Sequence, residues 1–381
     1  MTTTGGLKGR KALLRSYHAP FDIVEEAVPD PELGAIVLKV VQAGICGSDL
    51  HHWRGDHEGD LGPLPCGGKA IGHEGFGIVA RLGKGVTTDF AGNPIREGSR
   101  IVHAAVFHCG QCRMCKAGDT NQCRALKGLR PHDQFPFHTG FFADYYYLPP
   151  NHPVFVVPDD LSDNALTLVN CALGATAEGL IRAGVKQGDT VGIIGAGGLG
   201  LCASAFARDL GATNVVMLDL HEERLSAART FGSTLTLNAG KTSAAERKDA
   251  VDAITDGYGC DVIVEVAGVS KVISEAITLI RNGGTVMTMG CVVGNQPAAV
   301  DLSKMLRGKK LIGHGMYRPS TLPVVLDFLS RRKNDFPMEQ LVSKSFALED
   351  ISKAFQSAEW LGTTPAPSRV AVRTAGGPVR G

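Results

Sequence analysis

The sequence predicts an α/β protein with two domains, one built on a parallel sheet and the other rich in short strands. Its 381 residues are too many for one ordinary hydrophobic core and suit two domains. Strand-like and helix-like segments alternate from about residue 189 to 290, which is typical of a parallel sheet covered on both faces. Before about residue 155 the chain instead has short apolar runs bounded by glycine.

The elements of the first part follow from these runs. "AIVLKVVQAGI" (35–45) and "EGFGIVARLG" (74–83) are apolar or alternating, so we expect two strands. After the proline in "VFVVPDDLSD" (154–163), the pattern of apolar residues changes. The next segment, "NALTLVNCALGATAEGLIRAG" (164–184), has helical spacing.

The alternating part begins with a strand, a glycine turn, a helix and a second strand in 189–220. Two further strands, 260–268 and 283–292, flank the helical segment 270–283. After about residue 310 the alternation fades, so we expect the chain to return to the first domain. We therefore predict one domain from 1–171 with 311–381, and a nucleotide-binding domain from 172–310.

Composition excludes several classes of protein. The net charge is +1, which gives no electrostatic reason to expect a nucleic acid or membrane partner. The start of the chain lacks the apolar core of a secretory signal, and no apolar run reaches about 18 residues. We therefore expect a cytoplasmic protein that acts on a small molecule.

Four cysteines crowd into "CGQCRMCKAGDTNQC": Cys109, Cys112, Cys115 and Cys123. In a reducing compartment such clusters indicate metal ligands, and four thiolates close a tetrahedral, structural Zn²⁺ site. The alternatives are an iron–sulfur cluster, four buried thiols, or a zinc ribbon that binds nucleic acid. The near-neutral charge and the lack of a basic stripe oppose the ribbon.

The motif "GAGGLG" contains Gly195, Gly197, Gly198 and Gly200, between a predicted strand and helix. In a dinucleotide-binding unit, Gly195 permits the tight turn, Gly197 lets the pyrophosphate approach, and Gly200 allows close packing. Asp219 closes the next strand and would repel a 2′-phosphate, which favours NAD over NADP; Arg224 nearby weakens that preference. The alternative is a glycine turn without a ligand.

A third group of residues is spread along the chain. "GICGSDLHH" (44–52) contains Cys46, "GHEG" contains His73, and "VNCALGAT" contains Cys171. These form a possible Cys₂His set, a ligand type found at catalytic zinc. Such wide spacing cannot identify a site, and Cys171 alone would be interpreted as a helix-core thiol.

Taken together, these motifs resemble those of zinc-dependent medium-chain alcohol dehydrogenases. "GICGSDLH" resembles the segment of the first ligand, and "GHEGFGIVARLGKGV" matches the zinc signature. The four-cysteine lobe, the glycine turn and Asp219 follow in the family's order, so the resemblance extends from about Leu7 to Val372. It implies a GroES-like, β-rich catalytic domain interrupted by a Rossmann domain with a doubly wound parallel sheet.

The resemblance also implies two Zn²⁺ per chain. Cys46, His73 and Cys171 would hold the catalytic ion, with Glu74 beside it as an exchanging ligand and Asp49 bonded to a ligand imidazole. The four clustered cysteines would hold the structural ion. Asp219 and Arg224 would bind the adenosine ribose.

For catalysis, the resemblance assigns proton removal to Ser48 and His51, while zinc acidifies the alcohol and nicotinamide accepts hydride. His52 is expected to be a surface neighbour. The implied activity is reversible oxidation of an alcohol by NAD to an aldehyde or ketone, in a homodimer or homotetramer. A polyol or phosphonate-type hydroxy compound is the alternative substrate. A zinc-free quinone reductase would not need the Cys₂His set.

The chain departs from the family pattern at three places. The segment 52–72, with Trp53 and Cys66, is longer than usual and either reshapes the substrate mouth or forms a surface loop. Ala105 replaces a bulky aromatic residue and suggests a wide pocket. The loop 124–138 has basic residues that suit an anionic substrate or merely a solvated surface: Lys127, Arg130 and His132.

Overall fold

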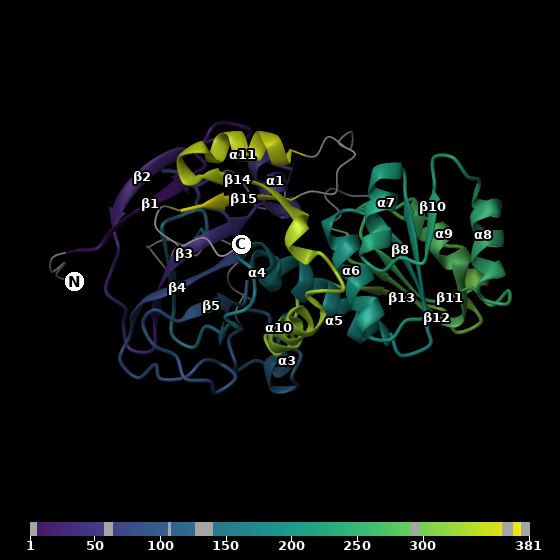
Figure 1. Ribbon diagram of the computed structural model, residues 1–381, viewed down its shortest axis with the longest axis horizontal. Coiled ribbons are helices and arrows are strands. Elements are labelled where there is room, and N and C mark those ends of the chain that lie inside the picture. The colour runs from purple at the N-terminus through teal and green to yellow at the C-terminus, as the bar shows by residue number, and fades with distance from the viewer. Residues whose placement is uncertain are drawn as a thin grey trace.

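The computed structural model describes residues 6–56, 64–105, 108–125, 140–290, 297–359 and 369–374. Figure 1 shows an elongated molecule with one large sheet in each half and several helices between them. This arrangement confirms the predicted fold class, a β-rich domain joined to a Rossmann-type α/β domain. No helix in these ranges is both long and apolar enough to cross a bilayer.

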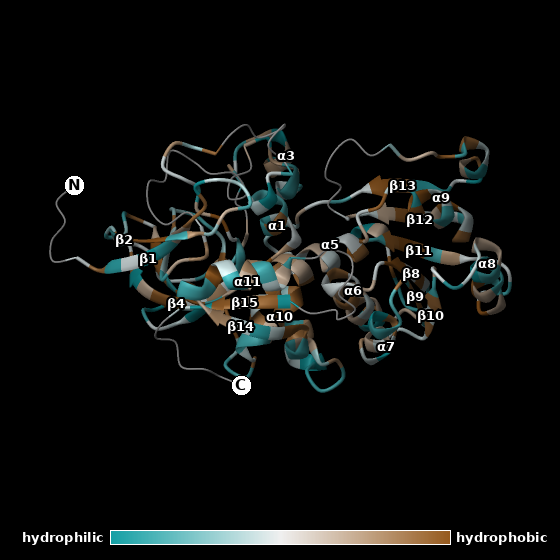
Figure 2. Cartoon of the chain, turned by 90° about the horizontal axis from the view of Figure 1, so that it is seen from above, coloured by the Kyte–Doolittle hydropathy of each residue, from teal (hydrophilic) through white to brown (hydrophobic). Residues whose placement is uncertain are grey.

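The Rossmann-type sheet has six parallel strands in the order β10-β9-β8-β11-β12-β13. Helices cover its two faces, so its strands are apolar along most of their length, as the brown ribbons of Figure 2 show. The strands are β8 (Thr190–Ile194), β9 (Asn214–Asp219), β10 (Leu235–Asn238), β11 (Cys260–Glu265), β12 (Ile280–Thr288) and β13 (Lys310–Gly313). The helices that follow them are α6 (Gly198–Asp209), α7 (Glu222–Thr230), α8 (Ala244–Ala253) and α9 (Val272–Leu279).

The second sheet has seven strands, six of them in the order β14-β15-β3-β4-β5-β7, with β6 paired to β3. Its two C-terminal strands return to it from beyond the parallel sheet, and β15 pairs antiparallel with β3. Its members are β3 (Ile36–Gly44), β4 (Glu74–Leu82), β5 (Arg100–His103), β6 (Tyr145–Leu148), β7 (Val154–Val156), β14 (Val342–Ala347) and β15 (Arg369–Arg373). A separate pair is formed by β1 (Lys8–Leu13) and β2 (Asp22–Ala27).

The remaining helices lie between the sheets or on the β-rich half (Figure 1). Residues from both halves share one hydrophobic cluster, in which Phe76 of β4 and Leu201 of α6 are both buried. The helices are α1 (Gly47–Arg54), α3 (Arg113–Lys116), α4 (Asp163–Thr167), the π-helical turn η2 (Val169–Leu173), α5 (Gly174–Ala183), α10 (Thr321–Arg332) and α11 (Ile351–Ala358). Short 3₁₀ turns are η1 (Thr120–Gln122), η3 (Leu302–Met305), η4 (Met338–Leu341) and η5 (Leu348–Asp350).

Two boundaries differ from the sequence analysis. The helix predicted to extend to residue 283 ends at Leu279, and β12 begins at Ile280. The following Asn-Gly-Gly sequence disfavours helix, and Ile280 pairs with Cys260 of β11. The predicted domain boundary at 310/311 falls inside β13, which pairs with β12.

Candidate active site and metal centres

Asp49 connects the start of α1 to His73, the residue directly before β4. Its Oδ2 atom accepts the backbone N–H of Cys46 at 2.9 Å, which fixes the first turn of the helix. Its Oδ1 atom lies 3.3 Å from His73 Nδ1. The imidazole is thereby oriented with Nε2 facing away from Asp49, which leaves Nε2 available as a metal ligand.

Three ligand atoms distant in sequence converge at this point. The Cys46, His73 and Cys171 ligand atoms all lie within 4.8 Å of one another. The two sulfur atoms are 3.6 Å apart, and Cys171 Sγ is 3.4 Å from His73 Nε2. A tetrahedral Zn²⁺ with Zn–S bonds of about 2.3 Å separates its sulfur ligands by about 3.8 Å. The donor set therefore fits Zn²⁺ and leaves a fourth position open.

The pKa shifts of the side chains in this cluster favour the binding of a cation. The hydrogen bond from Cys171 is the main cause that lowers the pKa of Cys46 well below its ordinary value. Burial lowers the pKa of His73, but the charge and hydrogen bond of Asp49 outweigh it, so that the pKa is raised. The buried Cys46 thiolate is stabilised by the protons of its neighbours. A bound metal ion would take the place of those protons.

Cys171 lies in η2, where the chain widens from α-helical to π-helical geometry. Such π-turns are frequent at functional sites because they redirect side chains. The neighbouring Asn170 was not predicted from the sequence. It donates to His73 O at 3.0 Å and accepts from Gly75 N at 2.9 Å, so it holds the backbone on both sides of Glu74. A polar residue inside an apolar run, next to Cys171, was the available signal.

Glu74 and Arg369 form a buried ion pair beside the cluster. Burial raises the pKa of the Glu74 carboxyl, and the Arg369 guanidinium opposes that shift. Glu74 is not in the compact three-residue set, although the resemblance placed it near the metal. Arg369 was not predicted as a site residue. A side chain at Gly198 would meet its Nε atom at 2.8 Å, so this guanidinium also lies against the glycine turn.

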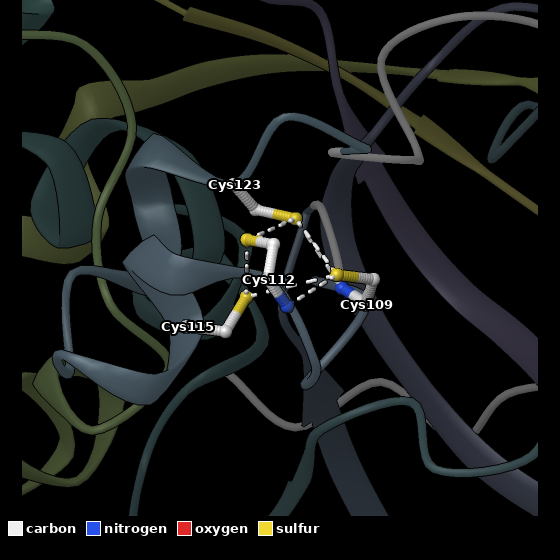
Figure 3. Close-up of side chains that lie close together, drawn as sticks. All are labelled: Cys109, Cys112, Cys115 and Cys123. Carbon is white, nitrogen blue, oxygen red and sulfur yellow. Dashed lines mark hydrogen bonds between the residues drawn. The ribbon is translucent and has the colours of Figure 1, made fainter.

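The four clustered cysteines form the second centre. Figure 3 shows their sulfur atoms facing one another across a small space. Their Sγ–Sγ distances are 3.5 to 4.0 Å, close to the separation that a tetrahedral zinc ion requires. Backbone N–H groups lower the pKa of Cys112 to about 6. The two clusters together indicate two zinc ions per chain, which agrees with the sequence analysis.

The glycine turn has the geometry expected of a dinucleotide site. Gly195 has φ +109°, which favours glycine. A Cβ at Gly200 would lie 1.9 Å from Gly195 O, so α6 packs directly on the turn. Among the described residues, no atom other than those of its chain neighbours lies within 4 Å of where a Gly197 side chain would begin, which leaves room for a pyrophosphate at the start of α6.

A pocket of about 520 Å³ adjoins this turn and has Asp219 in its lining. The Asp219 carboxylate accepts the backbone N–H groups of Ala196, Leu220 and His221 at 2.7 to 2.9 Å. Arg224 Nη1 lies 3.9 Å from the same carboxylate. The negative charge is therefore held in a fixed position at the pocket, which is mainly apolar and is lined also by Ile194, Leu218, Val266, Ala267 and Val269.

Ser48 and His51 lie one turn apart on α1, so both project from the same side of the helix. His51 Nδ1 is 2.7 Å from Asp56 Oδ2, and its side chain is 25% exposed. Trp53 on the same helix is buried, and its Nε1 donates to Ala19 O at 2.8 Å. Trp53 therefore anchors α1 in the hydrophobic core.

The three departures from the family pattern concern residues that could affect the substrate pocket. Ala105 is buried, and its N–H donates to the Tyr317 hydroxyl at 2.9 Å. Cys66 is exposed. Residues 57–63 of the long segment, and Lys127, Arg130 and His132, lie outside the described residues.

Comparison with known proteins gives matches over most of the chain. A family model described as "Alcohol dehydrogenase GroES-like domain" matches residues 32–159, and one described as "Zinc-binding dehydrogenase" matches 198–331. A 5-exo-hydroxycamphor dehydrogenase of Pseudomonas putida is 31% identical over 336 residues, which cover 87% of this chain and 91% of that protein.

Solved structures agree with these matches. An alcohol dehydrogenase from Thermotoga maritima superimposes with a TM-score of 0.87 at 29% identity, covering 97% of this chain and 100% of the other. An alcohol dehydrogenase from Escherichia coli, solved with NADH, has a TM-score of 0.80 at 25% identity and the same coverage.

Proposed function

This chain belongs to the zinc-binding medium-chain alcohol dehydrogenase family, and from that premise we propose that it transfers hydride reversibly between an alcohol and NAD. The product of oxidation is an aldehyde or ketone. One observation carries the proposal: Arg369 pairs with Glu74 beside the Cys₂His set and lies against Gly198 of the glycine turn. One side chain therefore links the metal cluster to the nucleotide turn, which supports a single site for both.

Zn²⁺ held by Cys46, His73 and Cys171 would supply a Lewis acid toward an alcohol oxygen, and NAD would supply a hydride acceptor. The chain's own task is to orient these groups and remove one proton. The Ser48 hydroxyl accepts the proton of the substrate hydroxyl and passes its own to His51. The partial exposure of His51 supports release of that proton to water.

NAD is the proposed cofactor because Asp219 lines the pocket beside the glycine turn. Its carboxylate would accept hydrogen bonds from ribose hydroxyls and repel a 2′-phosphate. Arg224 supports the carboxylate from 3.9 Å. The cytoplasmic location and the homodimer or homotetramer expected from the sequence stay predictions.

A screen of NAD⁺ reduction tests the proposal. Primary, secondary, cyclic and anionic alcohols are offered to the zinc-loaded protein, and absorbance of NADH is followed. We expect at least one class to react, and Cys46→Ser to abolish the reaction. Cys66→Ser is the matched control because Cys66 is an exposed thiol outside both clusters. If no alcohol reacts, or Cys46→Ser retains full activity, the proposed function is wrong. A selective reaction with anionic alcohols would favour the phosphonate-type alternative.

A further inference from the structure

The C-terminal end of α1 is closed by a polar pair where an apolar contact is usual. The N–H of Gly55 donates to His52 O at 3.3 Å, and the N–H of Asp56 donates to His51 O at 3.0 Å. These two bonds form a Schellman motif, which brings the residue after the left-handed glycine against the residue five positions earlier. In such motifs the two side chains are frequently hydrophobic. Here they are an acid and an imidazole.

This turn is held firmly by its surroundings. Gly55 has φ +83°, and a Cβ there would lie 2.8 Å from the Tyr17 ring. Only glycine therefore fits without strain. Arg54 Nη1 lies 3.9 Å from the same Asp56 oxygen that contacts His51, while Arg54 Nε lies 3.4 Å from Glu359. Asp56 is placed by the backbone turn and by a neighbouring cation.

The pair also has a definite hydrogen-bond direction. Asp56 Oδ2 is 2.7 Å from His51 Nδ1. An ionised carboxylate can only accept, so Nδ1 carries the proton and Nε2 is the basic nitrogen of the neutral imidazole. In histidines, the hydrogen bond that one ring nitrogen makes commonly determines that the other ring nitrogen is the basic one.

We propose that Asp56 is a positioning residue for proton transfer by His51, an inference that rests on the proposed function. The proton of the Ser48 hydroxyl moves to Nε2 of His51 as Ser48 takes the alcohol proton. The Asp56 carboxylate stabilises the imidazolium that forms. One proton then passes from the imidazolium to water, and Nδ1–H again binds Asp56. No further reactant is needed.

Kinetics of Asp56→Asn test this role, because the amide keeps the shape and removes the charge. We expect kcat for alcohol oxidation to fall about tenfold near pH 6, part of the effect typical of positioned proton transfer. The loss should shrink toward pH 9.5, where hydroxide replaces the relay. Zinc content and KM for NAD should stay at the wild-type values. In the His51→Gln background, Asp56→Asn should add little, because the two residues act as one unit.

A readout independent of turnover is the tautomer of His51. In protein labelled with ¹⁵N-histidine, the His51 signals are identified by their absence in His51→Gln. We expect the Nδ1–H form in the wild type and a shift toward the Nε2–H form in Asp56→Asn. Glu359→Gln is the matched control, since it removes an acid that contacts Arg54 and His18 at the same end of α1.

The outcomes separate the two proposals. Absence of any alcohol oxidation by the wild type would overturn the proposed function. An active wild type, with Asp56→Asn unchanged in pH profile and in tautomer, would overturn the role of Asp56 alone. An equal loss in Asp56→Asn and Glu359→Gln at every pH would also overturn it, because it would indicate a purely structural effect on α1.

Discussion

Arg369 of β15 and Glu74 of β4 form an ion pair across 295 positions of sequence. Glu74 follows the candidate ligand His73 directly, and Arg369 also lies against Gly198 at the start of α6. Both side chains are buried. One guanidinium therefore neutralises a buried acid beside the metal cluster and faces the turn where a pyrophosphate would bind.

We predict that Arg369→Gln destabilises the protein by about 3 to 5 kcal/mol, because it leaves a buried carboxylate without its cation. Urea unfolding at fixed zinc concentration measures the change. The double variant Glu74→Gln with Arg369→Gln should recover part of the loss, since no buried charge is then unpaired. A single variant as stable as the wild type would mean that Glu74 is neutral in the folded protein.

Protein purified without added metal should contain two zinc ions per chain. Elemental analysis of Cys46→Ser should give one, because only the Cys₂His site loses a ligand. Cys112→Ser should also give one, and we expect a lower unfolding temperature for it because a structural zinc ion contributes to folding. Cys66→Ser should retain both ions. A Cys46→Ser variant with two zinc ions would contradict the assigned catalytic site.

The protein should prefer NAD over NADP by at least roughly tenfold in kcat/KM, which is about 1.4 kcal/mol. Asp219→Asn should reduce this preference, because the amide can still accept backbone N–H groups but no longer repels a phosphate. Steady-state rates with both cofactors provide the measurement. A wild-type preference for NADP, or an unchanged preference in the variant, would contradict the role of Asp219.

His51→Gln should slow alcohol oxidation most at low pH, where solvent base is scarce. The loss should be roughly ten- to a hundredfold, since positioned proton transfer contributes about 10² to 10⁴ and water partly substitutes. A pH–rate profile and a zinc assay provide the measurements. Zinc loss would show that His51 is a ligand; a wild-type rate at every pH would show that the proton leaves by another route, such as His52 or bulk water.

His152 should make stability fall in mild acid. Burial lowers the pKa of His152 to about 4, while its Nε2 lies 2.7 Å from Ala104 O. The unfolded side chain has a pKa of about 6.5, so between these values the unfolded state binds more protons. The neutral His152 side chain therefore contributes its full stabilisation above about pH 6.5. This contribution, about 3 kcal/mol in all, is lost as the pH falls to about 4.

The comparison of His152→Gln with the wild type checks this pH effect. Unfolding free energies measured from pH 4 to 7 should change less steeply in the variant, whatever its stability at pH 7. Equal slopes in the two proteins would mean that another group carries the acid sensitivity.

The sequence alone determined the fold class, the four-cysteine centre and the glycine turn. Each depends on local order: ligands separated by two to seven residues, or a strand, turn and helix in succession. Such patterns survive without knowledge of the tertiary structure, because neighbours in sequence are neighbours in space. Element ends were less certain, as at Ile280, where pairing with β11 replaces helix by strand.

Only the tertiary structure decided which distant residues meet. Cys46, His73 and Cys171 were grouped by ligand type and assigned to the catalytic zinc through the family resemblance, because spacings of 27 and 98 residues contain no geometric information. Asn170 and Arg369 were missed for the same reason: each acts through a partner on another element. Trp53 was expected in a substrate mouth or a surface loop, but packing against Phe355 places it in the hydrophobic core. Sequence order limits local conformation, whereas convergence depends on how whole sheets and helices pack.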